Sequence, residues 1–183
     1  MQPLEVPNPT ELYGTTVLTR SVNSVDLAIP ADYRLLRVWW SARTDDAVAA
    51  QTITMTFNGD TAAHYGDQRA EAHVAAVSGV QTATASGIFV GTALGGASTA
   101  RAPGVGRVEI PNYSGSTFFK AVTGHNFEDR GGTALRIRPL GGIWRSSAPI
   151  RTVTLRAAGG SLLSVGSAFG WEVADPLAAA PGA

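Results

Sequence analysis

GGTALRIRPLGGIWRSSAPIRTVTLRAAGGSLLSVGSAFGWEV, residues 131–173, is the stretch that decides the fold. Three glycine pairs separate its strand-like runs, at 131–132, 141–142 and 159–160. Because glycine adopts positive φ without steric cost, a glycine pair between such runs predicts a turn. Residues 135–138 and 152–155 alternate polar and apolar side chains, which is the period of a half-buried antiparallel strand. No group of catalytic residues accompanies these strands, so the stretch indicates a protein built as a surface.

The rest of the chain continues this pattern upstream. Further strands are predicted at residues 15–20, 24–29, 34–42, 51–57, 85–90, 107–110 and 117–123. Small or polar residues predict loops at 92–104 and 124–132, and the alanine-rich residues 61–79 allow either a short helix around 67–76 or an irregular loop with a strand. About ten strands at short spacing predict an all-β fold, a single antiparallel β-sandwich of jelly-roll type.

The ends of the chain differ in composition from the strand-rich part. Residues 1–14 contain Pro3, Pro7 and Pro9, which exclude a helix interior and favour an extended N-terminal arm. Such an arm either orders against a neighbouring subunit or is a loose terminus. We therefore expect an arm at 1–14, a β-sandwich domain at 15–173 and a flexible Ala/Pro/Gly tail at 174–183.

Composition and charge narrow the function classes. Lys+Arg 14 balances Asp+Glu 14, so the chain lacks the concentrated positive charge that nucleic-acid binding by a basic field requires. Low net charge also removes the self-repulsion that keeps small proteins apart, which is compatible with an assembly. No stretch is apolar for long enough to span a bilayer, and the first residues lack the basic and apolar regions of a signal peptide. We expect neither a nucleic-acid nor a membrane partner.

The polar residues that attract attention as candidate sites favour turns instead. His64, His73 and His125 match no common zinc spacing, and Glu71 near His73 is interpreted as a solvated loop pair and not as a metal ligand or base. Asp45, Asp46 and residues 58–60 match no EF-hand, and their residue types are those of turns. The sequence therefore predicts no catalytic residue, no metal and no cofactor, although it leaves open a pair of carboxylates of the glycan-hydrolase kind.

Tryptophan and arginine are the remaining candidates for binding. The four tryptophans lie inside apolar strand patterns and are expected in the core: Trp39, Trp40, Trp144 and Trp171. Adjacent strand residues point to opposite faces, so one of Trp39 and Trp40 must lie under a loop, at an interface or in solvent. Four arginines are expected on solvated strand faces, or in interface ion pairs within an assembly: Arg136, Arg138, Arg145 and Arg151.

Three stretches resemble a known class of virion proteins. TITMTFNGD at 52–60, followed by Tyr65, resembles a strand-and-turn element of small structural proteins of tailed bacteriophages. VEIPNY at 108–113 resembles their middle strand, and GIWRSSAPI at 142–150, with the strand 151–155 and Gly166-Ser167, resembles their C-terminal hairpin. The resemblance covers residues 51–173. The chain departs from the pattern in its shortened final strand, 169–173, and in the loop 92–104.

The resemblance implies a jelly-roll-like component of the virion without catalysis, trimeric or otherwise symmetric. The first expectation is a capsid decoration (cement) protein that stabilises the head and has the major capsid protein or other virion proteins as partners. The second is a tail or head-fibre component that contacts the host surface. A third, from another class, is a carbohydrate-binding module or glycan hydrolase, which an exposed Trp or Tyr in a concave groove would favour.

Overall fold

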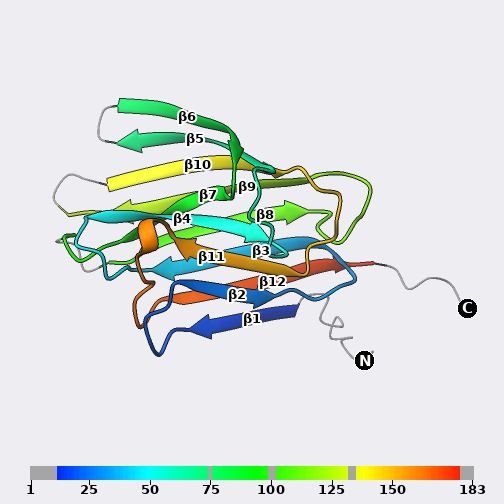
Figure 1. Cartoon of the computed structure of the whole chain (residues 1–183), viewed down its shortest axis with the longest axis horizontal. Helices are drawn as coiled ribbons and strands as arrows, with labels where there is room; N and C mark the ends of the chain where they lie inside the picture. Colours follow the sequence, from blue (N-terminus) through cyan, green and yellow to red (C-terminus); the bar gives the residue numbers. More distant parts are fainter. Residues whose placement is uncertain (1–11, 74–75, 99–101, 132–134, 178–183) are drawn as a thin grey trace, which may run out of the picture.

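The computed structural model describes residues 12–73, 76–98, 102–131 and 135–177, and their strands form two antiparallel sheets (Figure 1). The larger sheet has eight strands, in the spatial order β1 (Leu12–Val17), β12 (Ala168–Pro176), β3 (Tyr33–Ala42), β8 (Gly104–Pro111), β9 (Lys120–Asp129), β10 (Leu135–Trp144), β5 (Tyr65–His73) and β6 (Ala76–Ala85). The smaller sheet has four, in the order β2 (Ser24–Ala28), β11 (Thr152–Ala157), β4 (Ala50–Phe57) and β7 (Ile88–Leu94). None of the described residues forms a helix that is long and apolar enough to cross a membrane.

The core lies between the two sheets and follows from period-two alternation. In β3, every second residue from Leu36 to Ala42 is buried, and the residues between them face the outside of the larger sheet. In β4, which covers the strand predicted at 51–57, the alternating apolar residues Ile53, Met55 and Phe57 are fully buried. The predicted antiparallel β-sandwich is therefore confirmed.

The larger sheet extends beyond the smaller one on one side. β7, the edge of the smaller sheet, is buried along its whole length and packs on β8, β9 and β10. Beyond β10 lie β5 and β6, and the pairing with β5 is the one extensive contact of β6 among the described strands. Figure 1 shows this hairpin at the top of the molecule, and β1 at the opposite edge. β1 and β6 are thus the two edge strands of the larger sheet, with six strands between them.

The prediction of a turn at every glycine pair is wrong for one pair. Gly141 and Gly142 lie inside β10 and pair with strands on both sides. A Cβ on Gly142 would lie 2.6 Å from Cγ2 of Ile88, so glycine is needed there for close packing against β7 and not for a turn. Gly159 and Gly160 do form a turn, with φ of 68° and 80°.

Three segments contain more strand than the sequence predicted: the strand alternative holds for residues 61–79, and the loops predicted at 92–104 and 124–132 are shorter than expected. Residues 61–79 contain the whole of β5 and the start of β6, with no helix at 67–76 in the part that the structure describes. β7 continues to Leu94 inside the predicted loop 92–104, and β9 continues to Asp129 inside the predicted loop 124–132. Small and polar residues are compatible with strand in β6 because most of its side chains are exposed. They are compatible with strand in β9 because its buried positions include Asn126 and Glu128.

The expected terminal segments fall mostly outside the described residues. Residues 1–11 of the expected arm and 178–183 of the expected tail are not described. Leu12 to Gly14 belong to β1, which pairs with β12, and Ala174 to Pro176 extend β12 past the expected end of the domain.

Candidate functional site

The polarity of the larger sheet is inverted at one end of β9 and β10. Asn126 and Glu128 are fully buried between the sheets, and Arg138 is 2% exposed. Their strand neighbours Phe127 and Ile137, which are 37% and 55% exposed, face outward. The expectation that Arg136 and Arg138 lie on a solvated face is therefore wrong: both join a cluster on the inner side, and the apolar residues between them face solvent.

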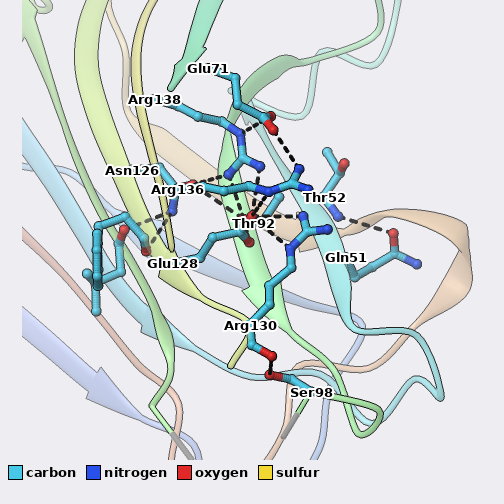
Figure 2. Close-up of polar contacts among 12 residues, drawn as sticks. Gln51, Thr52, Glu71, Thr92, Ser98, Asn126, Glu128, Arg130, Arg136 and Arg138 are labelled. Carbon is cyan, nitrogen blue, oxygen red and sulfur yellow. Dashed lines mark hydrogen bonds and ion pairs between the residues drawn. The ribbon is translucent and has the colours of Figure 1, made fainter. Parts of the chain in front are cut away.

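The inward-facing residues form a connected polar cluster (Figure 2). Arg138 is its centre: its guanidinium donates from Nη2 to Glu128 at 2.7 Å, from Nε to Glu71 at 2.7 Å, and from Nη1 to Asn126 at 3.0 Å. Thr92 Oγ1 donates a short hydrogen bond to Glu128. Two further arginines pair with these carboxylates: Arg130 with Glu128 at 2.8 Å and Arg136 with Glu71 at 2.5 Å. The cluster so defined joins β5, β7, β9 and β10.

One glycine makes room for the cluster. Gly91 in β7 has φ of 152°, at the register shift between β4 and β7. A Cβ on Gly91 would lie 2.7 Å from Cγ of Asn126, which is closer than packed carbon atoms approach. The glycine therefore lets β7 pass directly over the Asn126 side chain, whose amide donates to Val105 O at 2.8 Å.

The electrostatics of the cluster indicate a structural role. Burial by itself would raise the pKa of Glu128, but the hydrogen bonds from Thr92 and Arg138, together with the charges of Arg138 and Arg130, outweigh it and lower the pKa. The pKa of Glu71 is also lowered: its burial is outweighed by Arg138 and Arg136. A carboxylate whose charged form is favoured in this way is a poor proton acceptor near neutral pH. We therefore assign the cluster to the architecture and not to acid–base chemistry.

The outward side of the same strand segments carries an uncharged row of side chains. Strand register places one residue from each of the eight strands in this row, so it crosses the whole sheet. The members, from β1 to β6 across the sheet, are Val17, Ala168, Ser41, Val105, Phe127, Ile137, Ala72 and Val77. We call this set the outer row.

The outer row is exposed and differs from the rest of the face. Val17 is 59% exposed and Val77 is 78% exposed. On β3 the face becomes charged four residues before Ser41, which is about 13 Å from the outer row at the usual rise per residue. There Arg37 pairs with Glu109 at 3.1 Å and with Glu172 at 2.6 Å. An uncharged, mostly apolar row that crosses a whole sheet beside a charged zone is typical of an interaction surface.

A shallow groove of about 650 Å³ lies beside the outer row, over β10, β5 and β6. Small side chains and backbone form most of its floor, including Ala70, Gly79 and Gly141, while Gln68 and Gln81 supply amides. Arg145 borders the groove and donates to Tyr65 O at 3.0 Å and to Ala83 O at 2.8 Å. None of the lining residues, all within the described part of the chain, is Trp, Tyr or Phe.

The histidine and acidic candidates lie apart and mostly bind their own turns. His64 pairs with Asp60 at 2.9 Å, whereas Glu71 pairs with arginines and not with His73. His125 is exposed on the outer face of β9. Across the described residues, no three His, Cys, Asp or Glu side chains gather as a metal ion would require.

The residues considered for calcium hold turns together through hydrogen bonds. Asp45 accepts from the Leu162 amide at 2.8 Å, and Asp46 accepts from Ser161 Oγ at 2.6 Å. The Asn58 side chain accepts from the amides of Arg151 and Thr152 and donates to Pro149 O. Asp45 and Asp46 lie in a bend and Asn58 in a turn, as the residue types indicated, and their side chains link these positions to segments distant in the sequence.

The tryptophans divide between the core and its margin. Trp40 is buried between the sheets, and Trp144 is buried beside Tyr65 while its Nε1 donates to Asp60 at 2.7 Å. Trp171 is half-buried and packs on the margin of the core. Trp39 faces outward, as the alternation with Trp40 required, and lies over Gly170 of β12. The core assignment therefore holds for Trp40 and Trp144, and Trp39 is the outward member of its pair.

Sequence reasoning missed the outer row and the polar cluster. The signal available in the sequence was the polar run around Asn126 and Glu128, which predicts a loop. Even for a strand, alternation alone does not say which side is buried, so it does not place these polar residues inside the protein. No protein-family model matches this sequence, and a search of curated proteins finds none that is significantly similar to it.

Proposed function

We propose that this protein is a non-enzymatic structural protein of a bacteriophage virion, a decoration protein that binds the capsid through the outer face of its larger sheet. The observation that carries the proposal is the outer row. Phe127, Ile137 and Val77 remain in solvent while Arg138 and Glu128 occupy the interior behind them. Such an inversion is costly in an isolated subunit, and contact of the outer row with other proteins offsets part of that cost.

Three further features support a role in an assembly. The chain has no net charge, which favours contacts made by shape over long-range attraction and predicts weak dependence on salt. The resemblance of residues 51–173 to small virion proteins of tailed phages supports the same class. The groove beside the outer row lacks the aromatic platform that would favour a carbohydrate-binding module.

The test is addition of the purified protein to undecorated capsids. A decoration protein should saturate symmetry-related sites and raise the resistance of the capsids to heat, because a ligand of the assembled lattice stabilises it by mass action. Ile137→Glu, which places a charge in the outer row, should reduce attachment at least tenfold without loss of fold. Val165→Glu is the matched control, since Val165 is similarly exposed (61%) in the loop before β12.

Two outcomes would contradict the proposal. Equal attachment by the Ile137→Glu and Val165→Glu variants would show that the outer row is not the binding surface. Competition of the purified protein with phage for host cells, without binding to capsids, would instead assign it to a tail or head fibre.

A further inference from the structure

Among the described residues, the edge of the larger sheet along Ala76–Thr82 of β6 carries none of the usual protection against strand addition. β6 pairs with β5 on one side, and no described strand lies along its other side (Figure 1). Its sequence, AVSGVQTATA, contains no charged residue and no proline. Its register with β5 is regular from Ala76 to Thr82, about 23 Å of uninterrupted edge. Natural sheets ordinarily blunt such an edge with charges, proline, bulges or a covering segment.

The other sheet edges are protected in these ways. β2 has five residues and includes the exposed Asp26, and β7 is buried against the larger sheet. β1 has six residues, and shortness itself limits pairing. β6 is thus the longest exposed edge among the described strands.

The sequence before β1 contains prolines that would protect one edge of a strand. As a strand, this segment would pair along its other edge only. Residues 1–11 read MQPLEVPNPTE, with prolines at positions 3, 7 and 9. Successive N–H groups of a strand point to opposite sides, so the three missing donors would all fall on the same side. Residues 4, 6, 8 and 10 keep their donors on the other side. An added strand of this sequence pairs with one edge and closes it to further addition.

This segment cannot reach β6 of its own chain. β1 and β6 are separated by seven strand spacings, about 34 Å. Eleven fully extended residues span at most about 40 Å. Crossing the sheet would therefore use nearly the whole segment and leave nothing to run along β6. A β6 edge that residues 2–11 can reach and follow therefore belongs to another copy.

We propose that residues 2–11 of one copy add as an antiparallel or parallel ninth strand to the free edge of β6 in a second copy. Each copy then donates one segment and receives another, a head-to-tail contact that closes into a ring such as the expected trimer. In the added strand Leu4 and Val6 share one face, and Glu5 and Glu11 share the other. When Leu4 and Val6 lie beside the half-exposed Val80 on the inner face of β6, Glu5 and Glu11 lie on the outer face with Val77 and Gln81. The proposal deepens the proposed function and rests on it for the expectation that copies associate.

Sedimentation velocity of the full chain and of a chain lacking residues 2–11 is the first measurement. The full chain should associate, and the truncated chain should be monomeric with an unchanged β-type circular dichroism spectrum. A fluorescent peptide of residues 2–11 should bind the truncated chain saturably. Association that survives the truncation, a monomeric full chain, or a peptide that does not bind would each overturn the proposal.

A charge pair on β6 tests the edge itself. Within residues 2–11 the charged side chains are Glu5 and Glu11. Val77→Glu/Gln81→Glu should therefore weaken peptide binding at least tenfold relative to Val77→Lys/Gln81→Lys, which removes the same side chains but attracts the acidic peptide. Equal affinities of the two variants would contradict the assignment to β6.

A mixing experiment separates this contact from self-pairing of β6. The truncated chain keeps its edge, and full-length Val77→Glu/Gln81→Glu keeps its segment, so the two should form a 1:1 heterodimer and nothing larger. Self-pairing of β6 would instead leave the truncated chain as a homodimer, which would overturn the proposal. None of these measurements uses capsids, so their failure is distinguishable from failure of the capsid-binding test.

Discussion

Arg138 is the residue on which the interior cluster depends. Its guanidinium forms ion pairs with Glu71 and Glu128 and donates a further hydrogen bond to the Asn126 amide oxygen, and it is almost fully buried. A buried ion pair contributes little net stability compared with apolar residues of the same shape, but removal of one partner leaves the remaining buried charge with less compensation. Without Arg138, Glu128 keeps Arg130 and Glu71 keeps Arg136. The cluster is therefore a source of specificity for this packing more than a source of strength.

Arg138→Leu should lower the free energy of unfolding by about 3–5 kcal/mol, because Glu128 then loses its closest counter-charge in the interior. Arg138→Leu/Glu128→Leu should lose clearly less than the sum of the two single variants. Urea denaturation of the three variants measures both quantities. Additive losses would mean that the two side chains do not interact in the folded state.

Acid should destabilise the fold through the same carboxylates. The folded-state pKa values of Glu71 and Glu128 lie below their usual value of 4.5. Their contribution to stability is therefore present above about pH 4.5 and is lost as the pH falls through the lower folded-state values. Thermal unfolding followed from pH 6 to pH 3 should show this loss. Glu71→Gln should be less stable at pH 6 and lose less between pH 6 and pH 3; an unchanged slope would contradict the assignment.

Alkali should act through two buried tyrosines. Burial raises the pKa of Tyr65 and of Tyr113 to about 12. The unfolded chain ionises these phenols near pH 10, so their stabilising contribution is complete below pH 10 and is lost as the pH rises to about 12. Tyr65→Phe should reduce the loss of stability between pH 9 and pH 11.5, at a cost near neutral pH from the lost hydrogen bond to Asp60 O. The same loss in the variant and the parent chain would exclude Tyr65 as a contributor.

At the scale of elements, β10 shows how tightly the two sheets are fitted. It is a central strand with a glycine pair in its middle, and the two glycines have different surroundings. Gly142 faces Ile88 of β7, whereas a Cβ on Gly141 would find its nearest neighbour, Val122 O, at 3.7 Å. Their environments make them a matched pair for substitution.

Gly142→Ala should destabilise the protein by about 1–3 kcal/mol, because the new methyl group overlaps Ile88 and forces β7 away from β10. Gly141→Ala should be neutral or slightly stabilising, since alanine lowers the conformational entropy of the unfolded chain. Midpoints of urea unfolding for both variants are the measurement. A loss of similar size for Gly141→Ala would show that the backbone, and not the contact with Ile88, requires glycine.

At the scale of the whole molecule, stability should be uneven across the larger sheet. β3 lies inside the sheet with its alternate residues buried, while β6 is exposed along most of its length and lies beyond the smaller sheet. Segments with few buried contacts open at lower free energy than the core. β6 is therefore much more available than β3 for exchange with solvent or with a partner strand.

Hydrogen exchange should report this difference directly. In the monomeric chain lacking residues 2–11, the amides of β6 should exchange at least tenfold faster than those of β3. Addition of the 2–11 peptide should slow exchange in β6 and leave β3 unchanged. Mass spectrometry of peptic fragments resolves the two strands, and equal protection of both in the free chain would contradict the uneven stability.

The sequence by itself determined the period of the strands and the class of the fold. Alternation in residues 51–57 and 152–155 predicted strands, and both segments are strands, which the structure places in the smaller sheet. The residue types at Asn58-Gly59 and Gly159-Gly160 were also sufficient to predict turns. Their backbones have positive φ, which is a local preference of these residue types. Opposite directions for Trp39 and Trp40 followed from strand geometry alone.

Only the tertiary structure decided which side of each strand faces inward. Residues 135–138 alternate in the same way whether the arginines or the apolar residues are buried, and the choice depends on Glu71, Thr92 and Glu128, which come from three other strands. Gly142 lies within a strand because Ile88, distant in sequence, packs against it. The outer row likewise arises from register between eight strands. Such contacts depend on non-local pairing, which no window of sequence contains.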